Sequence, residues 1–287
     1  MQVKKCRNHL IFLLLVTVLV GCSSIKLGYR FLDNAIRWKI NDYVSLTAEQ
    51  SSQVTRRINE FHRWHQSTQL ATYADFMRRG VEQFERDSLG ADDFRKMYDE
   101  AFDLMGVSLD KLIPVITDML LSLDQSQIPQ VIKNLERESA NDLKSDFAIT
   151  PAQRLAKRQN RMIQRLVKWT GPLNKDQMAL IGTWAKDLPV DKEVRVSRQN
   201  ALLNTLAEQL RNRSNPQQFK LRILQQVKTP EKFSNQNYTK SYNKRKQMTL
   251  QLMADLFNSL TPQQRATLIA STRKYQTDFQ SLVPRQN

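Results

Sequence analysis

The sequence predicts an all-α protein, an irregular bundle or array of amphipathic helices, and three observations support this fold class. Apolar residues recur at spacings of three and four along most of the chain, and no long run alternates with a period of two. Glycine and proline are scarce, with 7 and 9 in 287 residues, which disfavours turn-rich β structure. Five segments also carry the pattern of a helix start.

The clearest amphipathic segment runs from Asp92 to Asp124. Apolar spacings of three and four place one buried face along it. That face consists of Phe94, Met97, Ala101, Leu104, Leu109, Leu112, Ile116, Leu120 and Leu123. We expect Pro114 to kink this helix and Gly106 to weaken it.

The five helix starts share one order: an aliphatic residue, a capping residue, and a glutamine three positions after the cap. In such a capping box the cap side chain accepts a backbone N–H bond and the glutamine reaches back to the cap's own N–H. The segments are 46–50, 123–127, 149–153, 173–177 and 260–264. We predict breaks between helices near Gly90, Leu123, Ile149, Gly171-Pro172, Leu188-Pro189, Asn215-Pro216 and the polar stretch 229–237. These breaks allow the mature chain to form two sub-bundles, 22–147 and 148–287.

The N-terminus predicts a secretory signal peptide over residues 1–21. Lys4 and Lys5 precede the uncharged run 10–20, which is too short to cross a bilayer as a permanent helix. The tetrad Leu19-Val20-Gly21-Cys22 resembles the lipobox of bacterial lipoproteins. This resemblance implies cleavage before Cys22, a diacylglycerol thioether and an N-acyl chain such as palmitate on that cysteine, and a mature protein 22–287 anchored without spanning. Ser23, where an aspartate signals inner-membrane retention, implies the outer membrane, on its periplasmic side.

Charge and cysteine content narrow the partners. The formal charge is +16, and +13 remains without the leader's Lys4, Lys5 and Arg7. Such an excess favours an anionic neighbour: at this address, anionic lipid, peptidoglycan or acidic envelope proteins, with no nucleic acid expected. With Cys6 removed and Cys22 acylated, no disulfide or thiolate metal site is expected. We predict no cofactor.

The strongest electrostatic feature is a basic stripe after Pro151. It comprises Arg154, Lys157, Arg158, Arg161, Arg165 and Lys168, with no acidic residue between Thr150 and Trp169. Leu155, Met162, Leu166 and Trp169 form an apolar stripe beside it. One interpretation is a surface that binds an anionic ligand or membrane. The other is internal packing against acidic residues such as Glu136, Glu138, Asp142 and Asp146.

Two further segments leave alternatives open. His62 and His65 lie three apart on a predicted helix, which suits either helix packing beside Phe61 and Trp64 or, with a third ligand, a metal. We expect packing and no metal site. The segment 25–40 mixes basic and apolar residues directly after Cys22, so it suits both a membrane contact and a first core helix.

Two resemblances bear on function. The segments Leu46 to Gln50 and Leu260 to Gln264 resemble the Leu-Thr-x-x-Gln motif of the Spy and CpxP periplasmic chaperones, which are all-α. The lipobox followed by Gly28-Tyr29-Arg30, Asp42-Tyr43-Val44, Leu46 to Gln50, Trp64-His65 and Trp169 to Leu173 with Gln177 resembles an uncharacterised family of proteobacterial lipoproteins. Gln66 departs from that family's arginine.

We therefore expect a non-enzymatic binding, scaffolding or chaperone-like role. The alternatives are an electrostatic adaptor for anionic lipid or peptidoglycan, and an envelope-polymer hydrolase that uses Glu49, Glu60 and His65. No nucleophile motif or glycine-rich phosphate loop occurs in the sequence, so we predict no catalytic residue.

Overall fold

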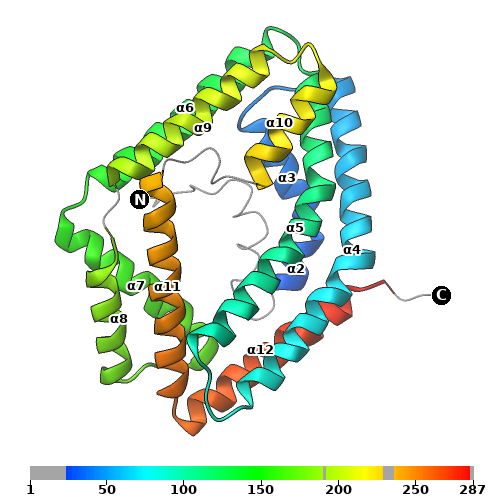
Figure 1. Ribbon diagram of the computed structural model, residues 1–287. Helices are drawn as coiled ribbons and strands as arrows, with labels where there is room; N and C mark the ends of the chain where they lie inside the picture. The colour runs from blue at the N-terminus through cyan, green and yellow to red at the C-terminus, as the bar shows by residue number, and fades with distance from the viewer. Residues whose placement is uncertain (1–23, 190–191, 229–235, 285–287) are drawn as a thin grey trace, which may run out of the picture. The chain divides into compact units, whose positions relative to one another are not determined.

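The computed structural model describes residues 24–189, 192–228 and 236–284. All regular secondary structure in these residues is helical, in elements α2 to α12 (Figure 1). The predicted all-α fold class is therefore confirmed. The predicted breaks are confirmed too, since each boundary from α4 to α11 in the described residues falls at one of them, and α12 begins within the predicted helix start 260–264.

The chain forms two compact units, and each takes three segments of sequence. Unit 1 comprises Met1–Gln66, Met105–Ala148 and Lys192–Tyr238; unit 2 comprises Ser67–Leu104, Ile149–Asp191 and Thr239–Asn287. Two long helices, α4 (Ala48–Phe84) and α5 (Ala91–Ser122), each contribute one half to either unit. The sequence predicts two contiguous sub-bundles, 22–147 and 148–287, whereas the chain passes between the two units at five points, one of them at Ala148/Ile149.

Unit 1 also contains α2 (Ser24–Arg30), α3 (Leu32–Asn41), α6 (Gln127–Phe147), α9 (Lys192–Arg211) and α10 (Pro216–Lys228). Helices α6 and α9 run side by side (Figure 1). The core of this unit is formed by Val44, Ile113, Leu120, Leu123, Ile128, Val131, Ile132, Ala207, Leu210, Phe219 and Ile223. The apolar spacing in 92–124 predicts the burial of Leu120 and Leu123 in this core, because residues three and four apart share one helix face.

Unit 2 also contains α7 (Pro151–Thr170), α8 (Lys175–Asp187), α11 (Gln236–Asn258), whose first three residues lie in unit 1, and α12 (Pro262–Leu282). Helix α7 packs against α8 and α12. Its apolar stripe faces inward: Met162 is buried with Ile181, and Trp169 stacks on Tyr275 with ring centroids 4.7 Å apart. The predicted apolar face of α7 is confirmed.

Helix α5 continues from Ala91 to Ser122 with Pro114 inside it. Its C-terminal carbonyl groups, which have no partner within the helix, accept hydrogen bonds from the Arg213 guanidinium. That group donates to the carbonyl oxygens of Leu120, Leu121 and Leu123. Burial lowers the pKa of Arg213, yet the guanidinium still supplies the charge that a helix C-terminus favours.

Candidate functional site

The glutamines of two helix starts meet in unit 1. Gln50 Nε2 donates to Gln127 Oε1 at 2.9 Å, and Gln127 Nε2 donates back to Gln50 Oε1 at 2.9 Å. Each amide also donates to the loop before the other helix, Gln50 to the Ser122 carbonyl and Gln127 to the Ser45 carbonyl, both at 2.7 Å. This reciprocal pair ties together two loops that lie 77 residues apart in sequence.

Unit 2 contains the same arrangement. Gln177 Nε2 donates to Gln264 Oε1 at 2.8 Å and to the Ser259 carbonyl at 3.0 Å. Gln264 Nε2 donates to Gln177 Oε1 at 2.9 Å and to the Pro172 carbonyl at 2.7 Å. Gln177 is fully buried. Four of the five motif glutamines are therefore buried connectors between loops.

The fifth glutamine shows what capping alone looks like. Gln153 completes a capping box with Thr150 but lies exposed. The predicted capping boxes at Thr47, Asn174 and Thr261 are also present. The residue types of the two Leu-Thr-x-x-Gln segments thus have a complete structural explanation, and the chaperone resemblance stays a prediction.

The predicted start of the helix after Leu123 needs a correction. Helix α6 begins at Gln127, with Ser126 in the cap position and no side-chain cap bond, instead of at a box headed by Asp124. Gln127 still accepts a bond from the Asp124 N–H at 2.8 Å. The Gln127 backbone N–H bonds to the Asp124 carbonyl instead of its side chain, which makes a turn and delays the helix.

The two histidines pack against the first described helix. The Tyr29 hydroxyl of α2 and His65 Nδ1 of α4 share a hydrogen bond of 2.9 Å, and both side chains are buried. The Tyr29 ring also lies edge-on to His62, with centroids 4.7 Å apart. Phe61 packs on the other side of His65. These contacts make the histidines a docking surface for α2.

Burial keeps both imidazoles neutral near pH 7. Burial and the neighbouring His62 lower the pKa of His65 to about 4, and burial lowers the pKa of His62. His62 Nε2 is buried without a hydrogen-bond partner. Among the described residues, no three His, Cys, Asp or Glu side chains gather in a group that would hold one metal ion.

The residues suggested for hydrolysis do not converge. His65 is buried, whereas Glu49 and Glu60 are exposed on the same helix. Glu49 and Glu60 are eleven residues apart, which is about 16 Å along an α-helix. Glu60 instead lies 3.6 Å from Arg57. Acid–base chemistry needs groups within hydrogen-bond reach of one substrate, and this set does not provide them.

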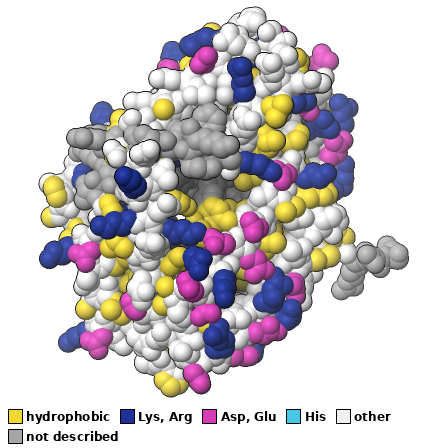
Figure 2. Space-filling view, viewed as in Figure 1, with side chains coloured by type: hydrophobic (Ala, Val, Ile, Leu, Met, Phe, Trp, Pro, Cys, Tyr) yellow, Lys and Arg dark blue, Asp and Glu magenta, His cyan; other side chains and the backbone are white. Residues whose placement is uncertain are grey.

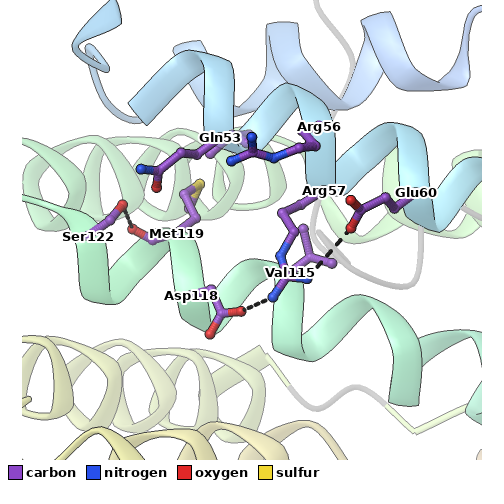
Figure 3. A pocket seen from close by; sticks show the side chains of 9 residues that line it. Gln53, Arg56, Arg57, Glu60, Val115, Asp118, Met119 and Ser122 are labelled. Carbon is purple, nitrogen blue, oxygen red and sulfur yellow. Dashed lines mark hydrogen bonds and ion pairs between the residues drawn. The ribbon is translucent and has the colours of Figure 1, made fainter. Parts of the chain in front are cut away.

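A polar hollow of about 320 Å³ lies between the unit 1 halves of α4 and α5 (Figure 3). Arg57 of α4 points toward Asp118 of α5, with Nη2 2.8 Å from Oδ2, and toward Glu60. Lys220 of α10 also lies 2.6 Å from Asp118. The hollow therefore contains a mutually neutralised ion-pair group, which sequence spacing did not indicate because its members come from three helices.

The six basic residues of α7 divide into two groups. Arg158 donates to the carbonyl oxygens of Ala185 at 2.5 Å and Leu188 at 3.4 Å, at the end of α8, and Arg154 donates to the Ile149 carbonyl at 3.3 Å. Lys157 is half-buried. These three residues lie in the contacts around α7, where Arg154 and Arg158 cap backbone carbonyl groups.

The other three, Arg161, Arg165 and Lys168, form an exposed line that we call the basic row. In the described residues of unit 2, no carboxylate forms an ion pair with any of them. Some other cations of the unit are paired, such as Arg78 with Asp75 at 2.7 Å and Lys246 with Asp99 at 2.7 Å. Figure 2 shows such interspersed acidic and basic side chains on one face.

The acidic residues suggested as internal partners for α7 have other roles where the structure describes them. Glu138 lies 3.1 Å from Lys39 and accepts a hydrogen bond from Tyr43, all within unit 1. Glu136 is exposed. The side chains of Asp142 and Asp146 lie outside the described residues. The described contacts therefore leave the basic row without an internal partner.

A known protein family includes most of the residues described above. A profile described as a family of unknown function matches residues 42–239. The chain belongs to this family, DUF6279. The match includes Tyr43, Gln50, His65 and Gln177, and it ends before Gln264. No curated protein and no solved structure matches the chain.

Two further structural features of this DUF6279 protein were not predicted from the sequence. One is Tyr29, which holds α2 to His65; the other is Arg213, which caps α5. Each acts across a long sequence separation, so no local spacing indicates it. The glutamines themselves carried a signal, however, because all four paired glutamines lie in helix-start segments that the sequence singles out.

The predicted lipid attachment residue, Cys22, lies outside the described residues of the DUF6279 protein. The same is true of the signal peptide, residues 1–21. In the described part of the chain, no helix is long and apolar enough to cross a bilayer. The first described helix, α2, starts at Ser24.

Proposed function

We propose that this protein is a lipoprotein of the cell envelope, anchored through acylated Cys22 on the periplasmic side of the outer membrane. Its helical body then acts as a non-enzymatic binding protein, an electrostatic adaptor whose basic row engages an anionic envelope component. Peptidoglycan carboxylates are the partner chemistry that we choose for the test.

The observation that carries the adaptor role is the exposed basic row, for which the described residues of unit 2 provide no ion-pair partner. Arg161, Arg165 and Lys168 follow one another at i, i+4 and i+7, so they point to one side of α7. The inner side of the same helix is held by Trp169 stacking on Tyr275. The cations are thus presented on a firmly packed support, which lowers the entropy cost of binding.

The anchor is supported by the sequence of the leader, in which Cys22 follows Leu19-Val20-Gly21. More than one acyl chain is needed for durable attachment, because each buried methylene contributes about 0.8 kcal/mol. Lipobox processing supplies such a set of chains. The anchored body would then work close to an anionic surface, where its basic charge is useful.

The test is co-sedimentation of the purified mature protein with isolated peptidoglycan. We expect binding that weakens as salt rises. The variant Arg161→Glu/Arg165→Glu should bind at least about tenfold more weakly, since each basic residue near an anionic surface contributes about 1 kcal/mol.

Helix α11 offers a matched control. Lys240 and Lys244 are also exposed, also four residues apart and also in unit 2. Lys240→Glu/Lys244→Glu changes the net charge equally, so it should retain most of the binding. Equal losses of binding in both variants would show that net charge, and not the basic row, determines binding. Binding that does not respond to salt would contradict the adaptor role.

A further inference from the structure

The first two helices carry an unusual concentration of exposed apolar side chains. Leu27, Phe31 and Trp38 are 58%, 55% and 71% exposed, and Trp38 is the most exposed large apolar residue in the described chain. Three of the eight such residues in the described chain thus fall within twelve positions. Exposed aromatic residues gathered in this way mark an interaction surface.

These residues point to one side. Their spacing of four and seven places the three side chains within about 40° of each other around a continuous helix. The turn at Phe31 preserves this register, because its N–H bonds to the Leu27 carbonyl at 3.3 Å and its carbonyl accepts from Ala35 at 2.9 Å. Leu27, Phe31 and Trp38 therefore form a single exposed apolar row along α2 and α3.

The opposite side of the same helices is fixed to unit 1. Ile25, Tyr29 and Leu32 are buried, and Tyr29 is bonded to His65 of α4. Because α2 cannot turn this side outward without breaking that bond, the apolar row keeps a fixed direction relative to unit 1. The histidine pair thus positions the row.

The place of the row in the chain indicates what covers it. Leu27 is five residues from Cys22, a separation of at most about 18 Å even in an extended chain. Exposed Arg30 lies between Leu27 and Phe31 and suits an anionic surface. Tryptophan and phenylalanine beside arginine are the composition of a helix that lies in a membrane interface.

A second copy of the chain fits this row less well. The three side chains expose about 400 Å² in total, if a large side chain offers 150–250 Å². A stable protein interface buries about 800 Å² on each partner. A bilayer needs no such minimum, since the acyl chains already hold the protein at its surface.

We propose that Leu27, Phe31 and Trp38 insert into the headgroup region of the phospholipid bilayer and form a second membrane contact beside the acyl anchor. This contact would hold unit 1 in one orientation on the membrane. The proposal rests on the anchoring proposed above, and it concerns a surface separate from the basic row of α7.

The experiment uses the lipidated protein reconstituted into vesicles of phosphatidylethanolamine and phosphatidylglycerol. Tryptophan fluorescence is measured with lipids brominated near the headgroup, which quench only rings that enter the bilayer. We expect clear quenching in the parent protein and loss of most of it in Trp38→Phe. Trp184→Phe, which alters a half-buried ring of unit 2, is the matched control and should leave the quenching unchanged.

A second variant tests the row without removing the probe. Leu27→Gln/Phe31→Gln should weaken insertion at least about tenfold, because two buried apolar side chains are lost, and Trp38 quenching should fall accordingly. Val107→Gln/Leu221→Gln changes two other exposed apolar residues and should have no effect. All four substituted side chains are exposed, so circular dichroism should match the parent.

The outcomes separate the two proposals. A protein whose mass shows acylated Cys22 but whose quenching is the same with and without Trp38 overturns the membrane contact and leaves the anchor standing. A mass without acyl chains overturns the anchor and this proposal with it. Trp38 shielded from an aqueous quencher only at high protein concentration, without lipid quenching, indicates self-association and overturns the proposal.

Discussion

Units 1 and 2 tie their loops with the same pair of glutamine side chains but differ in how the helices around the pair begin. In unit 2 both members, Gln177 and Gln264, belong to full capping boxes. In unit 1 Gln50 does so, whereas Gln127 is the first residue of α6 and has no side-chain cap before it. The reciprocal bonds are nevertheless 2.8–2.9 Å in both units.

This difference separates two roles that one glutamine can play. As part of a cap, the glutamine satisfies a backbone N–H at a helix start. This role is separable from pairing, because Gln127 pairs without a side-chain cap and exposed Gln153 caps without a pair. The reciprocal pair satisfies buried loop carbonyls, and it is kept in both units. A buried polar group without a partner costs about 1–3 kcal/mol, so the pair is the more demanding of the two interactions.

The units also differ in their titratable cores. Both histidines of the described residues lie in unit 1, and His65 is buried there against Tyr29. The described residues of unit 2 contain no histidine. Mild acid should therefore act first on unit 1, at the contact that holds α2.

The largest expected effect is acid destabilisation through His65. Its pKa in the folded protein, about 4, lies below the value of 6.5 for a free imidazole, so the unfolded chain binds more protons between these pH values. Stability is full above pH 6.5 and falls by about 3 kcal/mol as the pH drops to 4. Urea unfolding at several pH values measures this fall, and His65→Phe should remove most of it. An unchanged pH slope in that variant would contradict the assignment.

The next largest effect on the free energy of unfolding is expected when a buried glutamine is replaced. Gln177→Ala leaves the Ser259 carbonyl and the Gln264 amide short of partners, so we expect a cost of about 2 kcal/mol in the free energy of unfolding. Urea unfolding monitored by far-UV circular dichroism gives the value. If Gln177→Ala lowered the free energy of unfolding no more than Gln153→Ala does, capping alone would explain Gln177, and its bonds between loops would add no stability.

A smaller effect is the coupling inside one pair. Gln177→Ala and Gln264→Ala remove the same reciprocal bonds, so a double-mutant cycle should give a coupling of about 1 kcal/mol. Gln50→Ala with Gln264→Ala changes residues of different units that share no bond, and these costs should add within about 0.5 kcal/mol. Additivity in the first cycle would show that the bonds between the two amides contribute nothing.

The smallest effect is expected at the exposed cap. Gln153→Ala removes one bond to the Thr150 N–H, at the surface, where water replaces it. We expect a cost of about 0.5 kcal/mol. Thermal unfolding of this variant beside Gln177→Ala compares a cap with a connector directly.

Much of the fold followed from local pattern. The helical spacing in 92–124 predicts α5, and the boxes at Thr150, Asn174 and Thr261 predict the starts of α7, α8 and α12, because caps act within one turn of the chain. The candidate site was predicted less well. The stripe from Arg154 to Lys168 is one line in sequence, yet Arg154 and Arg158 bond to backbone carbonyl groups and leave Arg161, Arg165 and Lys168 exposed.

The sequence alone therefore determined the helices, four of the five predicted caps, the apolar faces and the case for an acylated leader, since each depends on residues within a few positions of one another. Tertiary structure decided which glutamines pair, which arginines of α7 bond to backbone carbonyl groups, and how Tyr29 meets His65. Those contacts join residues 27 to 87 positions apart, and only the packing of the folded helices brings such residues within hydrogen-bond distance.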